Sequence, residues 1–284
     1  MGGSEGQQVF SATNAEIESL AEQLYSSDAN KAVSGDITLN LQYKAASTQT
    51  SSGTDFSSQK LFGYVNEAKL FARPTFSRFI SLLDNYVKTT GTAETVTSGE
   101  TSEQTAFVDE LFRTTIFSRL STFLISKGYY TSTDSFKADF KEMWFGLYTR
   151  TKGPLDSSGF EHYLGEIHGG KISGFHSWVQ FYLLEKTGEL NYLSYSADGP
   201  WTSFPDVYGF QYKLSTYLKT LGSMFIGSSP EFEFAAFTLC YITRPDSLCS
   251  LRAGGNTLKI QTYTWANSSY GNGKRYVASS YPVV

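Results

Sequence analysis

The chain has 284 residues, of which 40% are hydrophobic and 16% aromatic, a composition that excludes an intrinsically disordered protein. Its length allows one large domain or two small ones with a sizeable core. The 23 basic and 27 acidic side chains give a net charge of −4, which excludes a general electrostatic attraction for nucleic acid. A polyanionic partner would need a local basic patch. Because no run of about 18 apolar residues occurs, we expect no membrane span.

The N-terminus and the cysteines bear on compartment. Residues 1–8, MGGSEGQQ, lack the basic and apolar segments of a signal peptide, and we predict a disordered tail or a cloning remnant there. Cys240 and Cys249 either close a small loop or remain two buried thiols, and they lack zinc-type spacing. With the sequon at Asn267 they favour a secreted protein. Because no signal peptide is recognised, a cytoplasmic location is the alternative.

The first half of the chain is predicted to be mostly helical. Asn14 is a suitable cap for a first helix, and Pro74 opens another whose apolar face continues to Tyr86. Further apolar stripes at helical spacing occupy residues 107–124 and 136–147. These aromatic stripes indicate a packed core more readily than a ligand site.

The second half changes to alternation with a period of two. This pattern predicts strands at 190–195, 208–214, 217–221, 223–227, 258–265 and 276–280. Ser229 and Pro230 between them form a helix start, with serine as N-cap and proline at the first helical position. Helices followed by strands predict an α+β fold.

All three histidines lie within residues 156–186. Residues 159–167 fit a strand that carries His162, Gly169 and Gly170 fit a turn, and the apolar spacing after it fits a helix that begins near His176. A strand, a turn and a helix in this order can bring His162 and His176 together. Because histidine titrates near neutrality, such a pair is suited to acid–base catalysis.

Several long motifs carry a resemblance to a known family. The segments GFEHYLGEI, SGFHSWVQFYLLEK, KTLGSMFIGSSPEFEFAAFTLC and VASSYP resemble the EndoU family of poly(U)-specific endoribonucleases. The resemblance runs from about residue 17 to the end. It implies one EndoU domain over residues 9–284, with a mostly helical region to about residue 150 and a C-terminal catalytic module of antiparallel β-sheets from about 151. It also implies cleavage of single-stranded RNA at uridylates, leaving 2′,3′-cyclic phosphate and 5′-hydroxyl ends, often with dependence on Mn²⁺ or Ca²⁺.

The same resemblance assigns site residues. The two catalytic histidines of the family fall on His162 and His176, and its catalytic lysine falls on Lys219. The terminal hydroxyl-x-Tyr-Pro pattern falls on Ser279 and Tyr281, on a final strand expected beside the one that carries Lys219. The chain departs from the family at the turn after residue 214, where Ser-Thr replaces Asn-Gly, and it lacks the tryptophan expected after residue 213.

The chemistry of these residue types fits RNA cleavage through the 2′-hydroxyl. One group must take the hydroxyl proton, another must protonate the leaving oxygen, and a cation must stabilise the charged phosphorane. Two histidines and a lysine supply these functions, although the sequence leaves open which histidine is the base. Ser279 can hydrogen-bond the edge of uracil while Tyr281 stacks on the base.

Four further residues are substrate-site candidates. Arg150 and Lys213 can bind phosphates, although basic side chains of this kind more often form a solvated face. Glu161 and Glu166 flank His162, and one of them can orient a histidine or form a surface ion pair. We expect a monomer that binds single-stranded RNA containing uridine.

Two other classes of protein compete with this hypothesis. A metallohydrolase would use His162, His168 and His176 as a zinc triad, although helical HExxH spacing is missing. A non-catalytic RNA-binding protein of the same fold would be expected to have lost a catalytic group, whereas this chain keeps both histidines and Lys219. We expect His168, at the turn, to be exposed to solvent.

Overall fold

The computed structural model describes residues 12–284, so the prediction for residues 1–8 lies outside the described residues. The helices are α1 (Asn14–Ser26), α2 (Glu67–Leu70), α3 (Pro74–Ile80), α4 (Ser98–Phe112), α5 (Thr115–Ser126), α6 (Thr133–Phe145), α7 (Gly159–Leu164), α8 (Trp178–Lys186) and α9 (Pro230–Thr243). The strands are β1 (Ile37–Leu39), β2 (Phe62–Val65), β3 (Glu166–His168), β4 (Lys171–Ser173), β5 (Leu190–Asp198), β6 (Asp206–Leu214), β7 (Tyr217–Ile226), β8 (Leu248–Ala253), β9 (Asn256–Thr264) and β10 (Val277–Pro282).

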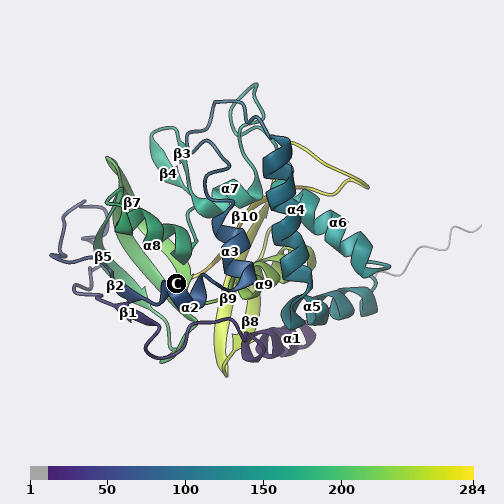
Figure 1. The fold of residues 1–284 in the computed structure, drawn as a ribbon, viewed down its shortest axis with the longest axis horizontal. Coiled ribbons are helices and arrows are strands. Elements are labelled where there is room, and N and C mark those ends of the chain that lie inside the picture. Colours follow the sequence, from purple (N-terminus) through teal and green to yellow (C-terminus); the bar gives the residue numbers. More distant parts are fainter. Residues whose placement is uncertain (1–11) are drawn as a thin grey trace, which may run out of the picture.

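The strands form small antiparallel sheets beside a group of helices, which confirms the predicted α+β fold (Figure 1). One three-stranded sheet has the order β5-β6-β7, and the other has the order β10-β9-β8. The strands β1 with β2, and β3 with β4, form two-stranded ladders. Helices α1, α4, α5 and α6 gather on the side away from the β5-β6-β7 sheet (Figure 1). No helix within residues 12–284 is both long and apolar enough to cross a membrane.

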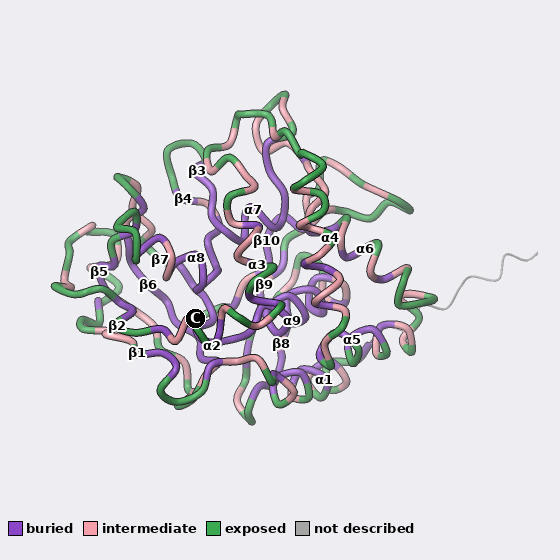
Figure 2. The backbone as a smooth tube through the Cα atoms, in the orientation of Figure 1, coloured by how far each residue is buried: buried purple, intermediate pink, exposed green. Residues whose placement is uncertain are grey.

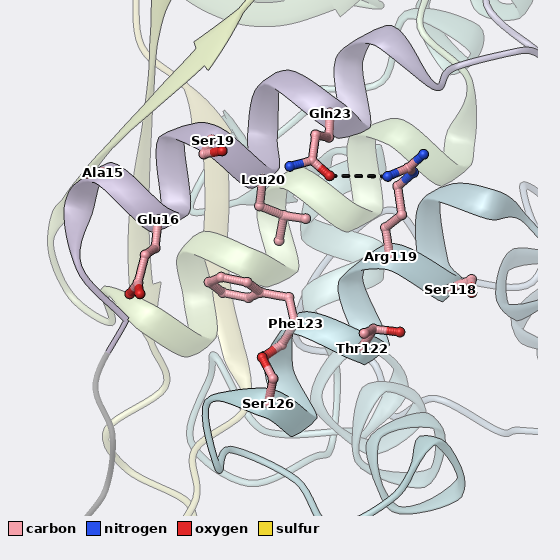
Figure 3. Close-up of a pocket in the computed structure, with 10 residues that line it drawn as sticks. All are labelled: Ala15, Glu16, Ser19, Leu20, Gln23, Ser118, Arg119, Thr122, Phe123 and Ser126. Atoms are coloured by element: carbon pink, nitrogen blue, oxygen red, sulfur yellow. Dashed lines mark hydrogen bonds between the residues drawn. The ribbon is translucent and has the colours of Figure 1, made fainter.

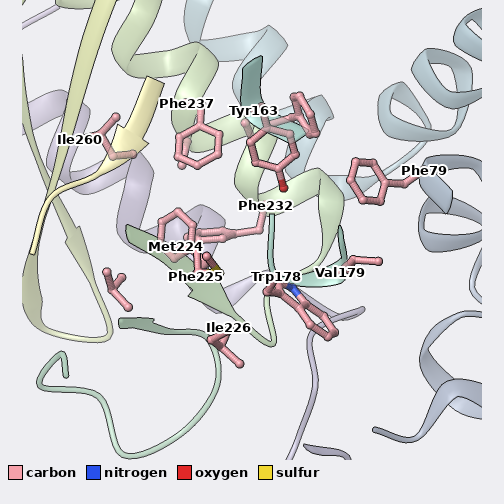
Figure 4. Packing of buried hydrophobic residues seen from close by; sticks show 14 of the residues in the cluster. Phe79, Tyr163, Trp178, Val179, Met224, Phe225, Ile226, Phe232, Phe237 and Ile260 are labelled. Carbon is pink, nitrogen blue, oxygen red and sulfur yellow. The ribbon is translucent and has the colours of Figure 1, made fainter. Parts of the chain in front are cut away.

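Helix α9 is the centre of the hydrophobic core. It is buried along nearly its whole length and contacts α1, α3 and α5 on one side and β9 and β10 on the other (Figure 2). The predicted start is confirmed, because the Ser229 hydroxyl accepts from the Phe232 N–H and Pro230 occupies the first turn. Phe232 and Phe237 meet Phe225 of β7 in edge-to-face and tilted contacts (Figure 4). The core therefore joins the helical region to both three-stranded sheets.

A disulfide ties the end of α9 to β8. Cys240 and Cys249 are bonded, with Cα atoms 5.6 Å apart, so the loop-closing alternative holds. Cross-links of this kind typically stabilise a fold by about 2–4 kcal/mol, because they restrict the unfolded chain. The bond fixes β8 against the core, and β8 in turn pairs with β9.

The predicted strand over residues 159–167 is wrong. These residues form α7, in which the Ser158 hydroxyl caps the first turn by accepting from the Glu161 N–H, followed by the short strand β3. Gly165, with φ of 105°, ends the helix. Every residue of α7 is buried, so its sequence has no polar face from which a helical period could be recognised.

Other element boundaries also differ from prediction. Thr13, not Asn14, caps α1 through a capping box with Glu16, and the helix opened by Pro74 ends at Ile80, short of Tyr86. The two strands predicted over 217–227 are one continuous strand, β7.

The strand that carries Lys219 and the final strand lie in different sheets, contrary to expectation. The β7 strand is an edge of β5-β6-β7, whereas β10 is an edge of β10-β9-β8, and these two strands contact each other across the boundary. The turn from β6 to β7 keeps a two-residue connection, with Ser215 at φ of 53° where the family has Asn-Gly. The departure in sequence therefore preserves the hairpin that carries Lys219.

Candidate active site

Two backbone hydrogen bonds bring His162 and His176 together. The Phe175 N–H donates to the His162 carbonyl at 3.0 Å, and the His176 N–H donates to the Tyr163 carbonyl at 2.8 Å. Gly174 permits this approach, because a Cβ there would collide with the His162 carbonyl. The imidazole centroids consequently lie 6.4 Å apart, although His162 comes from a helix and not from the strand we predicted.

His176 is buried and held on two sides. Its Nδ1 lies 2.7 Å from the Ser223 carbonyl oxygen, and because a carbonyl only accepts, Nδ1 carries the proton. The ring stacks on Tyr281 at 4.8 Å with an interplanar angle of 9°. Burial, and then the positive charge of Lys219, lower the pKa of His176 well below its ordinary value. The ring is therefore neutral with an unprotonated Nε2, which is the state of a general base.

His162 has an acidic neighbour instead of a carbonyl. Its Nδ1 lies 3.5 Å from Oε2 of Glu166, and the Arg150 Nε lies 3.2 Å from the same oxygen. Neither contact has hydrogen-bond geometry, so both are electrostatic. Burial, then Arg150 and Lys219, lower the pKa of His162, and burial raises the pKa of Glu166 to about 7. A proton that reaches His162 is stabilised by an ionised Glu166 behind it.

Lys219 completes the group from β7. Its ammonium donates to the Ile172 carbonyl of β4 at 3.3 Å, and burial lowers its pKa to about 8. Side chains directly opposite one another in an antiparallel pair share a face of the sheet. Lys219 pairs with Tyr212, whereas Lys213 pairs with Leu218, so the two lysines point to opposite faces. Of these two lysines, Lys219 alone lines the cavity that holds His162 and His176.

The histidines and Lys219 line one open cavity of about 860 Å³ between the two three-stranded sheets. Ser279 and Tyr281 line it from β10, and Gln261 and Tyr263 line it from β9. Our sequence reading missed Gln261 and Tyr263. No local sequence pattern indicates them, because they reach the cavity through strand pairing: Gln261 lies opposite Tyr281 and Tyr263 lies opposite Ser279. Because the ring of Tyr281 already stacks on an imidazole, one of its faces is covered, and the stacking of a base on it stays a prediction.

The other predicted substrate residues do not all face this cavity. Arg150 lines it, but its guanidinium donates to the Ser157 hydroxyl and the Ala278 carbonyl, so it positions neighbouring groups. Glu166 lies behind His162. The other two residues lie elsewhere: the Glu161 carboxyl accepts from its own helix cap, and the Lys213 ammonium lies near Gly53.

The histidines do not form a zinc triad. His168 is exposed as predicted, and its Nδ1 lies 2.8 Å from the Thr90 hydroxyl, outside the set of side chains that line the cavity. Across residues 12–284, no group of three or more His, Cys, Asp or Glu side chains is placed to hold a metal ion. The geometry thus separates His168 from the other two histidines.

A groove between α1 and α5 differs in chemistry from the histidine cavity. It encloses about 570 Å³ and is lined by serines, a threonine and apolar side chains, with Gln23 and Arg119 bonded across it at 3.1 Å (Figure 3). Its one carboxylate, Glu16, is already paired with Lys127. This groove therefore offers no acid–base pair.

Two imidazoles and a lysine in one cavity of an α+β fold define a nuclease-type acid–base site. The chain matches the family model described as Endoribonuclease XendoU over residues 16–282. It is 74% identical to Uridylate-specific endoribonuclease D of Xenopus laevis, over 96% of this chain and 90% of that relative. The Uridylate-specific endoribonuclease of Homo sapiens is 48% identical, over 95% of this chain and 66% of that protein.

A solved structure agrees with the sequence comparisons. The structure of XendoU, described as a splicing-independent snoRNA-processing endoribonuclease, superimposes with a TM-score of 0.79 at 35% identity. The match covers 96% of this chain and 98% of that one. The chain therefore belongs to the XendoU endoribonuclease family, the family that the sequence motifs indicated, and it is an endoribonuclease.

Proposed function

We propose that the chain, as a monomer, cleaves single-stranded RNA at uridylates through the 2′-hydroxyl and leaves 2′,3′-cyclic phosphate and 5′-hydroxyl ends. The observation that carries this proposal is the 6.4 Å separation of His162 and His176 in a cavity that Lys219 also lines. The names of the relatives support uridylate as the preferred site. All three groups line one cavity, so no observation favours the non-catalytic alternative.

The surroundings of the two histidines support a different role for each. His176, whose Nδ1 proton is held by the Ser223 carbonyl, takes the 2′-hydroxyl proton on Nε2. The 2′-oxygen then bonds to phosphorus, and the bond from phosphorus to the 5′-oxygen breaks. His162, protonated and backed by Glu166, gives its proton to that leaving oxygen. The Lys219 ammonium stabilises the negative charge that develops on the phosphoryl oxygens.

The buried lysine predicts an unusual pH dependence. The kcat/KM profile should be bell-shaped, because one histidine must be neutral and the other protonated. Lys219, with a pKa of about 8, is protonated below that pH and loses its charge above it, at a lower pH than an ordinary lysine does. On a plot of log kcat/KM against pH, the descending limb should therefore steepen from a slope of about −1 towards about −2 above pH 8. Rates measured between pH 5 and 10 check this expectation.

Lys219→Arg is the matched control for that profile. A guanidinium keeps its charge across this range, so the variant should lose the steepening even if its overall rate is lower. A limb of constant slope up to pH 10 in the unmodified protein would remove Lys219 from the charge-stabilising role.

Base choice is expected to depend on Ser279. Its side chain lines the cavity, where the hydroxyl can bond the N3–H or a carbonyl of uracil. We expect Ser279→Ala to narrow the preference for uridine over cytidine, and Tyr281→Ala to weaken cleavage at both bases. Competition between oligonucleotides with a single U or a single C measures the ratio. An unchanged ratio in Ser279→Ala would exclude that residue from base recognition.

The divalent cation implied by the family has no ready site in the described residues. Its ligands would be mainly carboxylates and other oxygen groups, and within residues 12–284 no group of three or more His, Cys, Asp or Glu side chains could hold a metal ion. We therefore derive no step through a metal ion. The proposed dependence on Mn²⁺ or Ca²⁺ is tested by running the same competition assay after chelation and after adding back each ion.

The disulfide supports export as the proposed localisation. Structural disulfides persist in oxidising compartments and are rare in the reducing cytosol. Cys240 and Cys249 are both buried, so their bond is shielded from reductants once formed. On this argument we propose that the protein is exported from the cytoplasm.

A further inference from the structure

A second cavity, of about 490 Å³, lies where the loop between β9 and β10 meets helices α6 and α9. It shares no lining residue with the histidine cavity. Four of its lining residues are tyrosines: Tyr129, Tyr130, Tyr241 and Tyr270. The loop is the yellow excursion beside α6 in Figure 1. Four tyrosines around a separate hollow indicate a ligand with a flat ring.

The tyrosine hydroxyls are largely used within the protein. Tyr130 donates to the Asp139 carboxylate, and Tyr241 donates to the Arg275 carbonyl. Asp139 also pairs with the Lys274 ammonium at 2.7 Å. That ammonium lies 4.8 Å from the centre of the Tyr130 ring. Because these polar groups are satisfied, the rings offer the cavity mainly their apolar surfaces. A cationic ligand is disfavoured, since Lys274 already lies over the ring beside the carboxylate.

The rim carries one arginine as well as Asp246, whose carboxylate accepts from the Thr264 N–H and hydroxyl. Arg275 lines the cavity, is exposed, and forms no ion pair among residues 12–284. A guanidinium recognises phosphate oxygens well because its donors form a planar fork. An aromatic hollow with a free arginine at its edge therefore has the two features that a nucleotide requires, a stacking surface and a phosphate contact.

The cavity is joined to the histidine site through one hairpin. The strands β9 and β10 carry Gln261, Tyr263 and Ser279 into the histidine cavity, and the loop between them carries Tyr270 and Arg275. Ser279 lies four residues beyond Arg275, a reach of roughly 13 Å along extended chain. An RNA strand that occupies the histidine cavity is thus within a few nucleotides of the second cavity.

We propose that this tyrosine cavity binds an unpaired base of the RNA strand whose uridylate lies in the histidine cavity, with Arg275 on a neighbouring phosphate. The inference rests on the proposed function for its substrate. Stacking on tyrosine is largely indifferent to base identity, so the cavity contributes affinity for longer RNA and not uridine preference.

Substrate length separates this site from the catalytic one. Tyr270→Ala is expected to lower kcat/KM roughly 5- to 150-fold on a single-stranded RNA of about twelve nucleotides, the range that loss of one stacked base produces. Cleavage of a dinucleotide, which cannot reach both cavities, should be unchanged. Tyr64→Ala, at a tyrosine 51% exposed on β2, is the matched control and should leave both rates unchanged.

Arg275→Ala provides a second measurement that does not depend on the packing of the loop. Loss of one phosphate contact should reduce the salt dependence of RNA affinity by about 0.7 in the slope of log K against log salt. Arg78→Ala, at an exposed arginine on α3, should leave that slope unchanged.

The affinity for a uridine-free oligonucleotide, measured by fluorescence anisotropy, tests the second site without relying on cleavage. Weaker binding in both Tyr270→Ala and Arg275→Ala supports the second site even if the proposed cleavage at uridylates fails. Unchanged affinity in both variants overturns it. Equal losses on the dinucleotide and the longer RNA also overturn it, because they would place Tyr270 in service of the catalytic cavity.

Discussion

His176→Ala and His162→Ala are each expected to lower kcat by about 10²–10⁴-fold on a uridine-containing oligonucleotide, the range typical for removal of an acid–base group. The reason is structural as well as chemical. The two rings face one cavity 6.4 Å apart, and each has a different group behind its Nδ1. Initial rates at saturating substrate, with thermal unfolding of each variant beside them, measure the loss.

Variants that keep the packing make this test sharper. His176→Asn retains an N–H that can donate to the Ser223 carbonyl, so it preserves the local hydrogen bond while removing the base. His168→Ala removes an exposed histidine that contacts Thr90 and should be close to neutral. A loss in His168→Ala as large as that in His162→Ala would revive the zinc-triad hypothesis. Full activity in His176→Asn would contradict the role of His176 as base.

The protein shows which parts of a fold a sequence predicts well. The start of α9 was predictable because serine and proline act locally, within the first turn of the helix. Helix α7 was not, because burial of all its residues removes the alternation of polar and apolar positions on which the prediction depended. Its cap, Ser158, was present in the sequence but lay before a segment with no helical period.

The site was predictable only as far as the family motifs reached. These motifs indicated His162, His176 and Lys219, and the structure places all three on one cavity. Arg150 and Lys213 were chosen for charge alone, and charge does not determine direction. The direction of a strand side chain is determined by strand pairing, and the register of β6 with β7 turns Lys213 away from the histidine cavity. Long-range pairing of this kind cannot be obtained from local sequence patterns.

Glu166 illustrates the same limit within the site. As a buried carboxyl between Arg150 and His162, it acts on the reaction through the two side chains that it contacts. On the strand that we predicted, Glu166 would have shared a face with His162, with Leu164 between them on that face. The turn from α7 into β3 instead brings its carboxylate behind the imidazole, where it can stabilise the protonated ring. Its role therefore follows from the helix that the sequence pattern concealed.

Replacing the uridine at the cleavage site by 2′-deoxyuridine is expected to abolish cleavage at that position. The proposed reaction takes its nucleophile from the substrate: His176, with its Nδ1 proton held by the Ser223 carbonyl, removes the 2′-hydroxyl proton with Nε2, and the 2′-oxygen then attacks phosphorus. Without that oxygen no cyclic phosphate can form. The modified oligonucleotide should still bind, since Ser279 contacts the base and Lys219 the phosphate in the proposed complex.

The experiment compares two oligonucleotides that differ only in this one oxygen, with end-group analysis of every product. The deoxy oligonucleotide should act as a competitive inhibitor of the unmodified oligonucleotide, and the two should bind with similar affinity. Products with 5′-phosphate ends, or cleavage of the deoxy substrate at the normal rate, would mean that water is the nucleophile. In that case the two histidines would have to activate a water molecule, and the assignment of His162 as the acid for a leaving 5′-oxygen would have to be replaced.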